Sequence, residues 1–494
     1  MILTGRTVIL AGRPIPLGPR EAADALTREV ASMPRGLRIW FAVLLAMIAV
    51  AVPAALLALP PGWEVLGTTP NFEWGLLIVG YVFFAITTSG LCLASSLGTV
   101  FGIERFRPLE KRHAVLALLC LTTAFGIIAL DLHYPVRMVF GAMLVPSPTS
   151  PMWWMGVFYG IYLCVLIVEV WSMFTNHPRI HQVACTMAAC TAIVAPATLG
   201  AVFGVLVARP FWHGPFTAVL MVASAFLSGT ALLGLVFFGV HRLRLAGAER
   251  AASLAIPSIR ILLGIGLGIV SLLVARQVVA GLTSELASFR EATALLVTGP
   301  LAWQFWGLRV VLGLAVPILL LTLPATRTPT GTFIASFLAI AGVFVDRMTF
   351  VAAGQIAPSS VAGNVVAPFA VYSPSLVEIA IILGALAFVA LVYTLAERYL
   401  DLNEADAHAA VTLPIPSLER IRALLPMRRR VAPAPVEPAA IKPGPAAAAI
   451  KPGPAAAAVQ PDPAAAAVQP GPAAASAGAA AAPVVARDVW VDVR

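Results

Sequence analysis

The sequence predicts an all-α fold: a polytopic integral membrane bundle of about ten transmembrane helices, followed by a disordered Pro/Ala-rich C-terminal tail. Ten long apolar segments lie between Leu37 and Tyr399. Each is near or above the roughly 20 residues that a helix needs to cross a bilayer. Only 11% of the 494 residues are charged, and the mean hydropathy is +0.92. A soluble fold could not bury so many apolar segments.

The ten segments are bounded by residues typical of span ends. Tryptophans lie near several of the ends, as is usual at a membrane–water interface. Glycine pairs four residues apart predict close helix contacts, at Gly98/Gly102, Gly200/Gly204 and Gly264/Gly268. The spans are expected at 37–59, 73–101, 114–130, 152–174, 182–207, 216–240, 258–282, 301–323, 330–350 and 376–399.

Positive charge is concentrated in alternate loops. The stretch before the first span and the loops after spans two, six and ten are rich in arginine, and the loops between them are poor in Lys and Arg. Positive loops stay in the cytoplasm. We therefore predict an even number of spans and two cytoplasmic termini, in the inner membrane of a bacterium. The net charge of +9 indicates topology and contact with anionic lipid, not nucleic-acid binding.

Five regions are expected along the chain. A nine-residue unit that contains prolines recurs from Lys442 and predicts a disordered or semi-extended linker. Around Trp490, valines alternate with polar residues, which favours a strand added to a partner's sheet; an unstructured tail is the alternative. The regions are 1–36 (cytoplasmic segment), 37–400 (ten-helix domain), 401–431 (basic cytoplasmic segment), 432–483 (linker) and 484–494 (docking peptide).

No metal, haem or iron–sulfur cluster is expected in this chain. The five cysteines lie inside apolar spans and form no CxxC pair, which is typical of small hydrophobic side chains. The seven histidines lie at span ends or outside spans. No two spans therefore offer facing histidines as axial ligands of a buried haem.

The outer end of the third span carries an acid, an imidazole and a guanidinium within seven residues. These are Asp131, His133 and Arg137. Such a group can bind a polar head group and accept protons, as the oxidation of a quinol requires. We predict Asp131 and His133 as catalytic residues, and the alternative is an interfacial turn in which Asp131 pairs with Arg137.

A second candidate lies in the loop between spans five and six. Arg209, Trp212 and His213 combine cationic and aromatic side chains, which suit a flat ring that carries carbonyl oxygens. Trp and His are also common at membrane interfaces without any ligand.

Polar residues inside the spans suggest a proton path. Glu169 lies deep in span four, Glu104 follows span two, and Ser89 belongs to a hydroxyl-rich stretch between them. Ionisable residues at such depth are costly and are often functional. The alternative is a hydrogen-bonded contact between helices.

Two further charged groups have structural interpretations. Ser375 and Glu378 have capping-box spacing at the start of the last span. Asp346 and Arg347 are adjacent and opposite in charge, and we expect them to be neutralised locally, though not necessarily by each other.

Several stretches resemble the NrfD/PsrC family of membrane subunits, in its longer, ten-helix branch. The resemblance runs in order over about 40–400, and its most specific part is Leu199–Val207 with the following Ala-Arg-Pro-Phe-Trp-His. Asp131-Leu132, Asp346-Arg347 and Tyr372–Glu378 also resemble that branch, which includes hydrogenase-2, DsrP and alternative complex III membrane subunits.

The resemblance implies a haem-free subunit that binds menaquinone or ubiquinone. Electrons would pass between the quinone and a separate ferredoxin-like iron–sulfur subunit, with a molybdopterin, hydrogenase or cytochrome-type catalytic subunit beyond it. The implied head-group region contains Asp131, His133, Arg137, Arg209, Trp212 and His213. Without a redox metal of its own, the chain would not be an enzyme alone. A secondary transporter and a passive membrane anchor are the alternatives.

Overall fold

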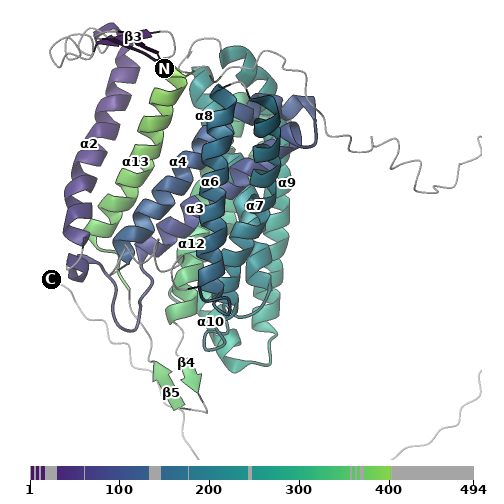
Figure 1. Ribbon diagram of the computed structural model, residues 1–494. Coiled ribbons are helices and arrows are strands. Elements are labelled where there is room, and N and C mark those ends of the chain that lie inside the picture. The colour runs from purple at the N-terminus through teal and green to yellow at the C-terminus, as the bar shows by residue number, and fades with distance from the viewer. Residues whose placement is uncertain are drawn as a thin grey trace, which may run out of the picture. The chain divides into compact units, whose positions relative to one another are not determined.

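Figure 1 shows the computed structural model, in which long helices lie side by side as a bundle. The bundle belongs to the first of two compact units, Met1–Ser417. The second unit, Leu418–Arg494, lies outside the described residues, and with it the expected linker and docking peptide. The structure describes residues 31–59, 62–132, 146–175, 177–242, 248–356, 372–400 and 402, together with five short strands.

Within the described residues, ten helices are long and apolar enough to span a membrane, which confirms the all-α membrane fold. The spans are α2 (Arg35–Ala58), α3 (Leu76–Thr99), α4 (Glu110–Asp131), α6 (Pro151–Phe174), α7 (Pro178–Gly204), α8 (Phe216–Arg242), α9 (Ala248–Leu282), the π-helix η3 (Gln304–Ala315) continued by α11 (Val316–Thr322), α12 (Pro329–Ile356) and α13 (Leu376–Tyr399). Short helices complete the helical elements: η1 (Gly62–Val65), η2 (Glu104–Leu109), α10 (Ala287–Val297) and η4 (Pro324–Thr326).

Five short strands were not expected from the sequence. β1 (Ile2–Thr4), β2 (Thr7–Leu10) and β3 (Arg13–Pro16) form an antiparallel sheet in that order. β4 (Ser359–Val361) and β5 (Asn364–Ala367) form an antiparallel pair, with a register shift between Ser359 and Ser360.

Several spans begin earlier than predicted, among them α9 at Ala248 instead of residue 258. The third begins at Glu110 instead of residue 114, and the fifth at Pro178 instead of residue 182. A hydropathy pattern sets the start of a span after the last charged residue. The helix itself can begin earlier, because its first turn tolerates charged and polar residues. An acid there also interacts favourably with the helix dipole. The earlier starts place His113 and His181 on helices.

α3 is at the centre of the bundle and α2 at its edge. α3 packs against α4, α7 and α8, and it is the most completely buried of the ten spans. α2 contacts mainly α13 and is the least buried, as Figure 1 shows at one edge. The Trp40 indole donates a hydrogen bond to the Thr394 hydroxyl over 3.2 Å, which joins the first span to the last.

Small residues permit the closest helix contacts, although not all at the predicted pairs. A Cβ at Gly200 would lie 2.5 Å from the Ala218 Cα, which confirms a close contact there between α7 and α8. Gly264 and Gly268 have open space instead, so that prediction was wrong. The tightest crossing joins α3 to α8, where a Cβ at Gly90 would lie 1.7 Å from the Ala225 carbonyl oxygen.

Successive spans run in opposite directions, so the helix ends gather at two ends of the bundle. We call the end at which α3 ends and α4 begins the basic end. The end at which α4 ends and α13 begins is called the distal end. The basic end takes its name from Arg105, Arg107, Lys111, Arg112 and Arg179.

We predict that Gly90→Ala lowers the melting temperature of the detergent-solubilised protein, by an amount equivalent to about 1–3 kcal/mol. The new methyl group would force α3 away from α8. Gly264→Ala is the matched control, since nothing lies near its Cβ position. Equal melting temperatures for the two variants would contradict the close crossing.

Candidate functional site

The Glu378 carboxylate organises a polar junction at the distal end. Its side chain is buried. The backbone N–H groups of Gly67 and Leu76 donate hydrogen bonds to it over 3.1 and 3.2 Å, and the Tyr372 hydroxyl donates over 2.9 Å. The Leu76 N–H also donates to the Tyr372 oxygen over 2.6 Å. One carboxylate therefore fixes the segment before α3 against the start of α13.

The same residue caps α13, as predicted. The Ser375 hydroxyl accepts a hydrogen bond from the Glu378 N–H, and the Glu378 carboxylate accepts one from the Ser375 N–H over 2.8 Å. This capping box is confirmed. The additional contacts to a distant segment show that Glu378 does more than cap its own helix.

Asp131 lies near this junction. It is the last residue of α4 and is partly buried. Burial is the largest cause of the raised pKa of Tyr372. The negative charge of Glu378 raises this pKa further, and the charge of Asp131 contributes more weakly. Tyr372 therefore stays a neutral hydrogen-bond donor beside two carboxyl groups. His133 and Arg137, predicted beside Asp131, lie outside the described residues.

Arg209 holds the loop after α7 against the end of α12. Its guanidinium donates a hydrogen bond to the Gln355 carbonyl oxygen over 3.2 Å. The Gln355 side chain in turn bonds to both backbone groups of Trp74, over 2.9 and 3.0 Å. Burial lowers the pKa of Arg209, an effect that the charge of Glu73 opposes.

Trp212 is a packed core residue in the structure. Its indole N–H donates to the Phe350 carbonyl oxygen over 2.9 Å, and its ring stacks on Trp74 at 5.1 Å. A Cβ at Gly354 would lie 1.9 Å from the ring, so only glycine leaves room for it. The predicted quinone contact of Trp212 stays a prediction, and its packing gives it a structural role.

His213 lines a cavity that Asp131 and Arg209 do not reach. The cavity, of about 450 Å³, lies between α8, α9, α10 and α12. Gln277 is buried in its wall, with a side-chain oxygen that has no hydrogen-bond partner among the described residues. The Arg276 guanidinium lies 4.0 Å from the centre of the Phe216 ring. Among the described head-group residues, His213 therefore lies at this cavity, whereas Asp131 lies near the junction.

Acidic and basic side chains form a second cluster at the basic end. His113 and Glu169 are 3.1 Å apart, with both side chains buried. His181 and Glu110 are 2.7 Å apart, with side chains 18% and 29% exposed. The Cys185 sulfur lies 3.6 Å from Glu169 and 3.5 Å from a His181 ring nitrogen. The cluster thus runs from the protein surface to a fully buried carboxylate.

The predicted proton path matches this cluster only at Glu169. Glu104 is exposed on η2, and no interaction of its side chain with the cluster is seen among the described residues. Ser89 is buried on α3, and its hydroxyl has no partner within the described part of the chain. Thr87 and Thr88 hydroxyls instead donate to carbonyls of their own helix over 2.7 and 3.0 Å.

Sequence reasoning missed Glu110, His113, His181 and Cys185. The signal was available as helical spacing, because Glu110 and His113 are three residues apart and His181 and Cys185 four apart. Residues so spaced share a helix face.

Asp346 is neutralised by two arginines between the ends of the bundle. It forms ion pairs with Arg347 and with Arg309, and all three side chains are buried. Local neutralisation was predicted, whereas Arg309 was missed. Arg309 lies on the π-helix η3, a geometry that is frequent at functional sites.

The fold and these buried groups define a multi-pass integral membrane protein with acid–base clusters at both ends of its bundle. The chain belongs to the polysulphide reductase NrfD family, which matches residues 64–359. The matched range contains α3 to α12, and α2 and α13 lie outside it.

Three relatives are similar over most of their own lengths. A selenate reductase subunit of Mesobacillus selenatarsenatis is 23% identical over 77% of this chain and 98% of that protein. A putative dimethyl sulfoxide reductase membrane subunit of Halobacterium salinarum is 26% identical over 75% and 93%. An Hdr-like menaquinol oxidoreductase integral membrane subunit of Archaeoglobus fulgidus is 23% identical over 66% and 84%.

We predict that Glu378→Gln destabilises the protein more than Ser375→Ala does. The glutamine amide would place N–H donors against backbone N–H groups, at a cost of roughly 2–3 kcal/mol. Loss of the serine cap costs about 1 kcal/mol. Denaturant unfolding of both variants, followed by tryptophan fluorescence, tests the order. Equal losses would show that capping is the only contribution of Glu378.

Proposed function

We propose that this chain is the haem-free, quinone-interacting membrane subunit of a multi-subunit oxidoreductase. It exchanges electrons between the quinone pool and a partner iron–sulfur subunit, with protons released or taken up at the same site. The supporting observation is the carboxylate junction at the distal end, in a family whose relatives carry the names of reductase membrane subunits. One relative is named as a menaquinol oxidoreductase subunit.

The head group binds beside Asp131 in this proposal. Oxidation of a quinol releases two electrons and two protons, so the site needs proton acceptors next to the hydroxyls. Asp131 is partly buried at a helix end, and we assign it the first proton. His133 takes the second, and Arg137 and Arg209 supply positive charge for the carbonyl oxygens. The electrons leave to the partner iron–sulfur subunit in this proposal.

Protons reach or leave the interior through the cluster at the basic end. Glu110 and His181 are partly exposed, and Glu169 is fully buried. These groups are within hydrogen-bonding range of one another or of Cys185. Ser89 lies on the central helix beyond them. In this proposal protons pass between Glu110 and His181 at the surface, then Glu169, then Ser89. Glu104 lies at the aqueous end of the path.

The cavity at His213 is the rival position for the ring. Its aromatic lining also suits a quinol, whose hydroxyl would donate to the Gln277 side-chain oxygen, an atom without a partner in the described part of the chain. Asp131 is favoured because two proton acceptors are needed, and among the described residues that line the cavity only His213 is an ionisable acceptor.

We predict that Asp131→Asn leaves the complex assembled and lowers quinol-linked turnover about 100-fold. The amide cannot accept the proton. His133→Ala should act in the same direction. Glu64→Gln, an exposed acid at the same end, is the matched control and should keep normal turnover.

Gln277→Leu, measured in the same quinol assay, separates the two positions. Loss of turnover in Gln277→Leu with normal turnover in Asp131→Asn would move the quinone to the cavity. Normal turnover in both would favour a passive anchor, and transport of a solute without quinone chemistry would favour a transporter.

We also predict a cytoplasmic basic end, since Lys and Arg collect there. A reporter fused after Arg430 should be cytoplasmic, and one fused within residues 146–151 should be exported. Activity of paired cytoplasmic and periplasmic reporters in whole cells measures this. The opposite result at both positions would invert the orientation and place the quinone site on the cytoplasmic side.

A further inference from the structure

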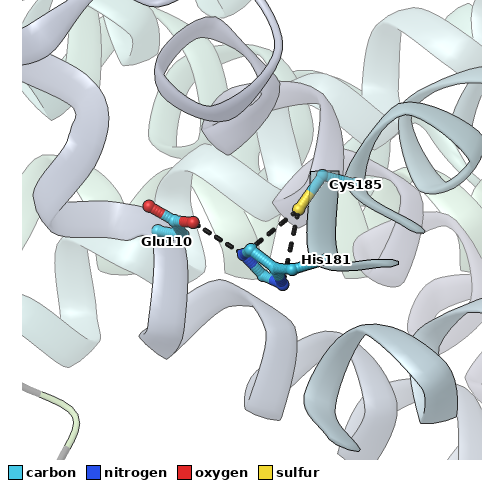
Figure 2. Close-up of side chains that lie close together, drawn as sticks. All are labelled: Glu110, His181 and Cys185. Carbon is cyan, nitrogen blue, oxygen red and sulfur yellow. Dashed lines mark hydrogen bonds and ion pairs between the residues drawn. The ribbon is translucent and has the colours of Figure 1, made fainter. Parts of the chain in front are cut away.

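At the basic end, the side chains of Glu110, His181 and Cys185 bring an oxygen, a nitrogen and a sulfur atom close together. Glu110 begins α4, and His181 and Cys185 lie one turn apart on the first turns of α7. Figure 2 shows the three side chains converging, and their ligand atoms all lie within 4.8 Å of one another. A carboxylate oxygen, an imidazole nitrogen and a thiol are therefore brought together by two helices.

A fourth group approaches from α6. The Glu169 Oε1 atom lies 3.6 Å from the Cys185 sulfur. Its Oε2 atom is buried and has no hydrogen-bond partner among the described residues. An unsatisfied carboxylate oxygen is costly in an apolar interior. A bound cation in this cluster would remove that cost.

The second ring nitrogen of His181 also has a hydrogen-bond partner. The Ser172 hydroxyl lies 3.3 Å from Nδ1 of His181, and Nε2 faces Glu110 at 2.7 Å. Metal-binding histidines commonly have their second ring nitrogen hydrogen-bonded in this way, which fixes the ring orientation. His181 is thus positioned to use Nε2 as a ligand.

We propose that Glu110, His181, Cys185 and Glu169 form a binding site for a divalent cation of the Zn²⁺ class. Nitrogen, sulfur and oxygen donors together select Zn²⁺ or Co²⁺, whereas Mg²⁺ and Ca²⁺ take oxygen ligands. Metal–ligand bonds of about 2.0–2.3 Å in a tetrahedron separate the ligand atoms by roughly 3.3–3.7 Å. The Cys185 contacts, at 3.5 and 3.6 Å, already have this spacing.

The Glu110–His181 contact must open from 2.7 Å by about half an ångström or slightly more, and Glu169 must approach the other three groups, whose ligand atoms already lie within 4.8 Å of one another. Glu110 is the most exposed of the four groups and begins its helix, so it has room to withdraw. The ion arrives from the aqueous phase at the basic end, and the Cys185 thiol releases its proton to solvent on binding. The site goes beyond the proposed quinone chemistry and does not depend on it, and a bound ion would occupy the side chains that we assign to the proton path.

Labelling of the cysteines in the unmodified full chain gives the first test. The protein in detergent micelles is treated with a maleimide with and without Zn²⁺, and mass spectrometry reads each cysteine. Zn²⁺ should slow modification of Cys185 at least about tenfold. Cys190 on the same helix and Cys164 on α6 are exposed, and both should react at unchanged rates. An unchanged rate at Cys185 would overturn the proposal.

Co²⁺ absorption gives the second test. Wild type and Cys190→Ser should bind one Co²⁺ with a thiolate charge-transfer band in the near ultraviolet, and Zn²⁺ should displace it. Cys185→Ser should lose the band, and Glu110→Gln should weaken binding about tenfold or more. Circular dichroism and gel filtration verify that each variant is folded. A spectrum without a thiolate band, or one that survives Cys185→Ser, would exclude the site whatever the outcome of the quinol assays.

Discussion

Lipid hydrocarbon offers no hydrogen-bond partner, so a polar group in the spans is costly unless it is satisfied within the protein. This constraint explains most of the long-range contacts. The Arg112 guanidinium, almost fully buried, forms a two-point ion pair with Glu397 and donates to the Leu402 carbonyl oxygen over 3.1 Å. Asp346 is likewise held between two arginines. Breaking one partner of such a pair costs about 3–5 kcal/mol, so these contacts fix which helices are neighbours.

The two ends of the bundle satisfy this constraint in different ways. At the distal end, backbone N–H groups surround one carboxylate, which makes the junction rigid and leaves Asp131 as the partly exposed acid beside it. At the basic end, side chains meet side chains through His181 and Cys185. A cation can take the place of a proton at these side chains. A bound cation and a proton that passes along the path would, however, need the same lone pairs of the carboxylate, imidazole and thiol groups. The two occupancies are mutually exclusive.

The spans and the cap of α13 could be predicted because both are local patterns: apolar length, and a serine three residues before a glutamate. The clusters could not, since they depend on which helices touch. Glu169 and His113 are far apart in the sequence yet pair at 3.1 Å. Arg209 and His213 are four residues apart in one hydrogen-bonded turn, but the Arg209 side chain bonds to the end of α12 and His213 lines the cavity. Because these two residues are close in the sequence, they were predicted to share one site, whereas the structure places them at two.

The Trp40–Thr394 contact bears on how the protein is made. α2, the first of the described spans to be synthesised, packs mainly on α13, the last of them, and the two contacting residues are 354 positions apart. Until α13 is inserted, α2 has to remain in the bilayer with lipid around it, which its mostly apolar, outward-facing surface permits. The contact between α2 and α13 can therefore form only after all the described spans between them have been made.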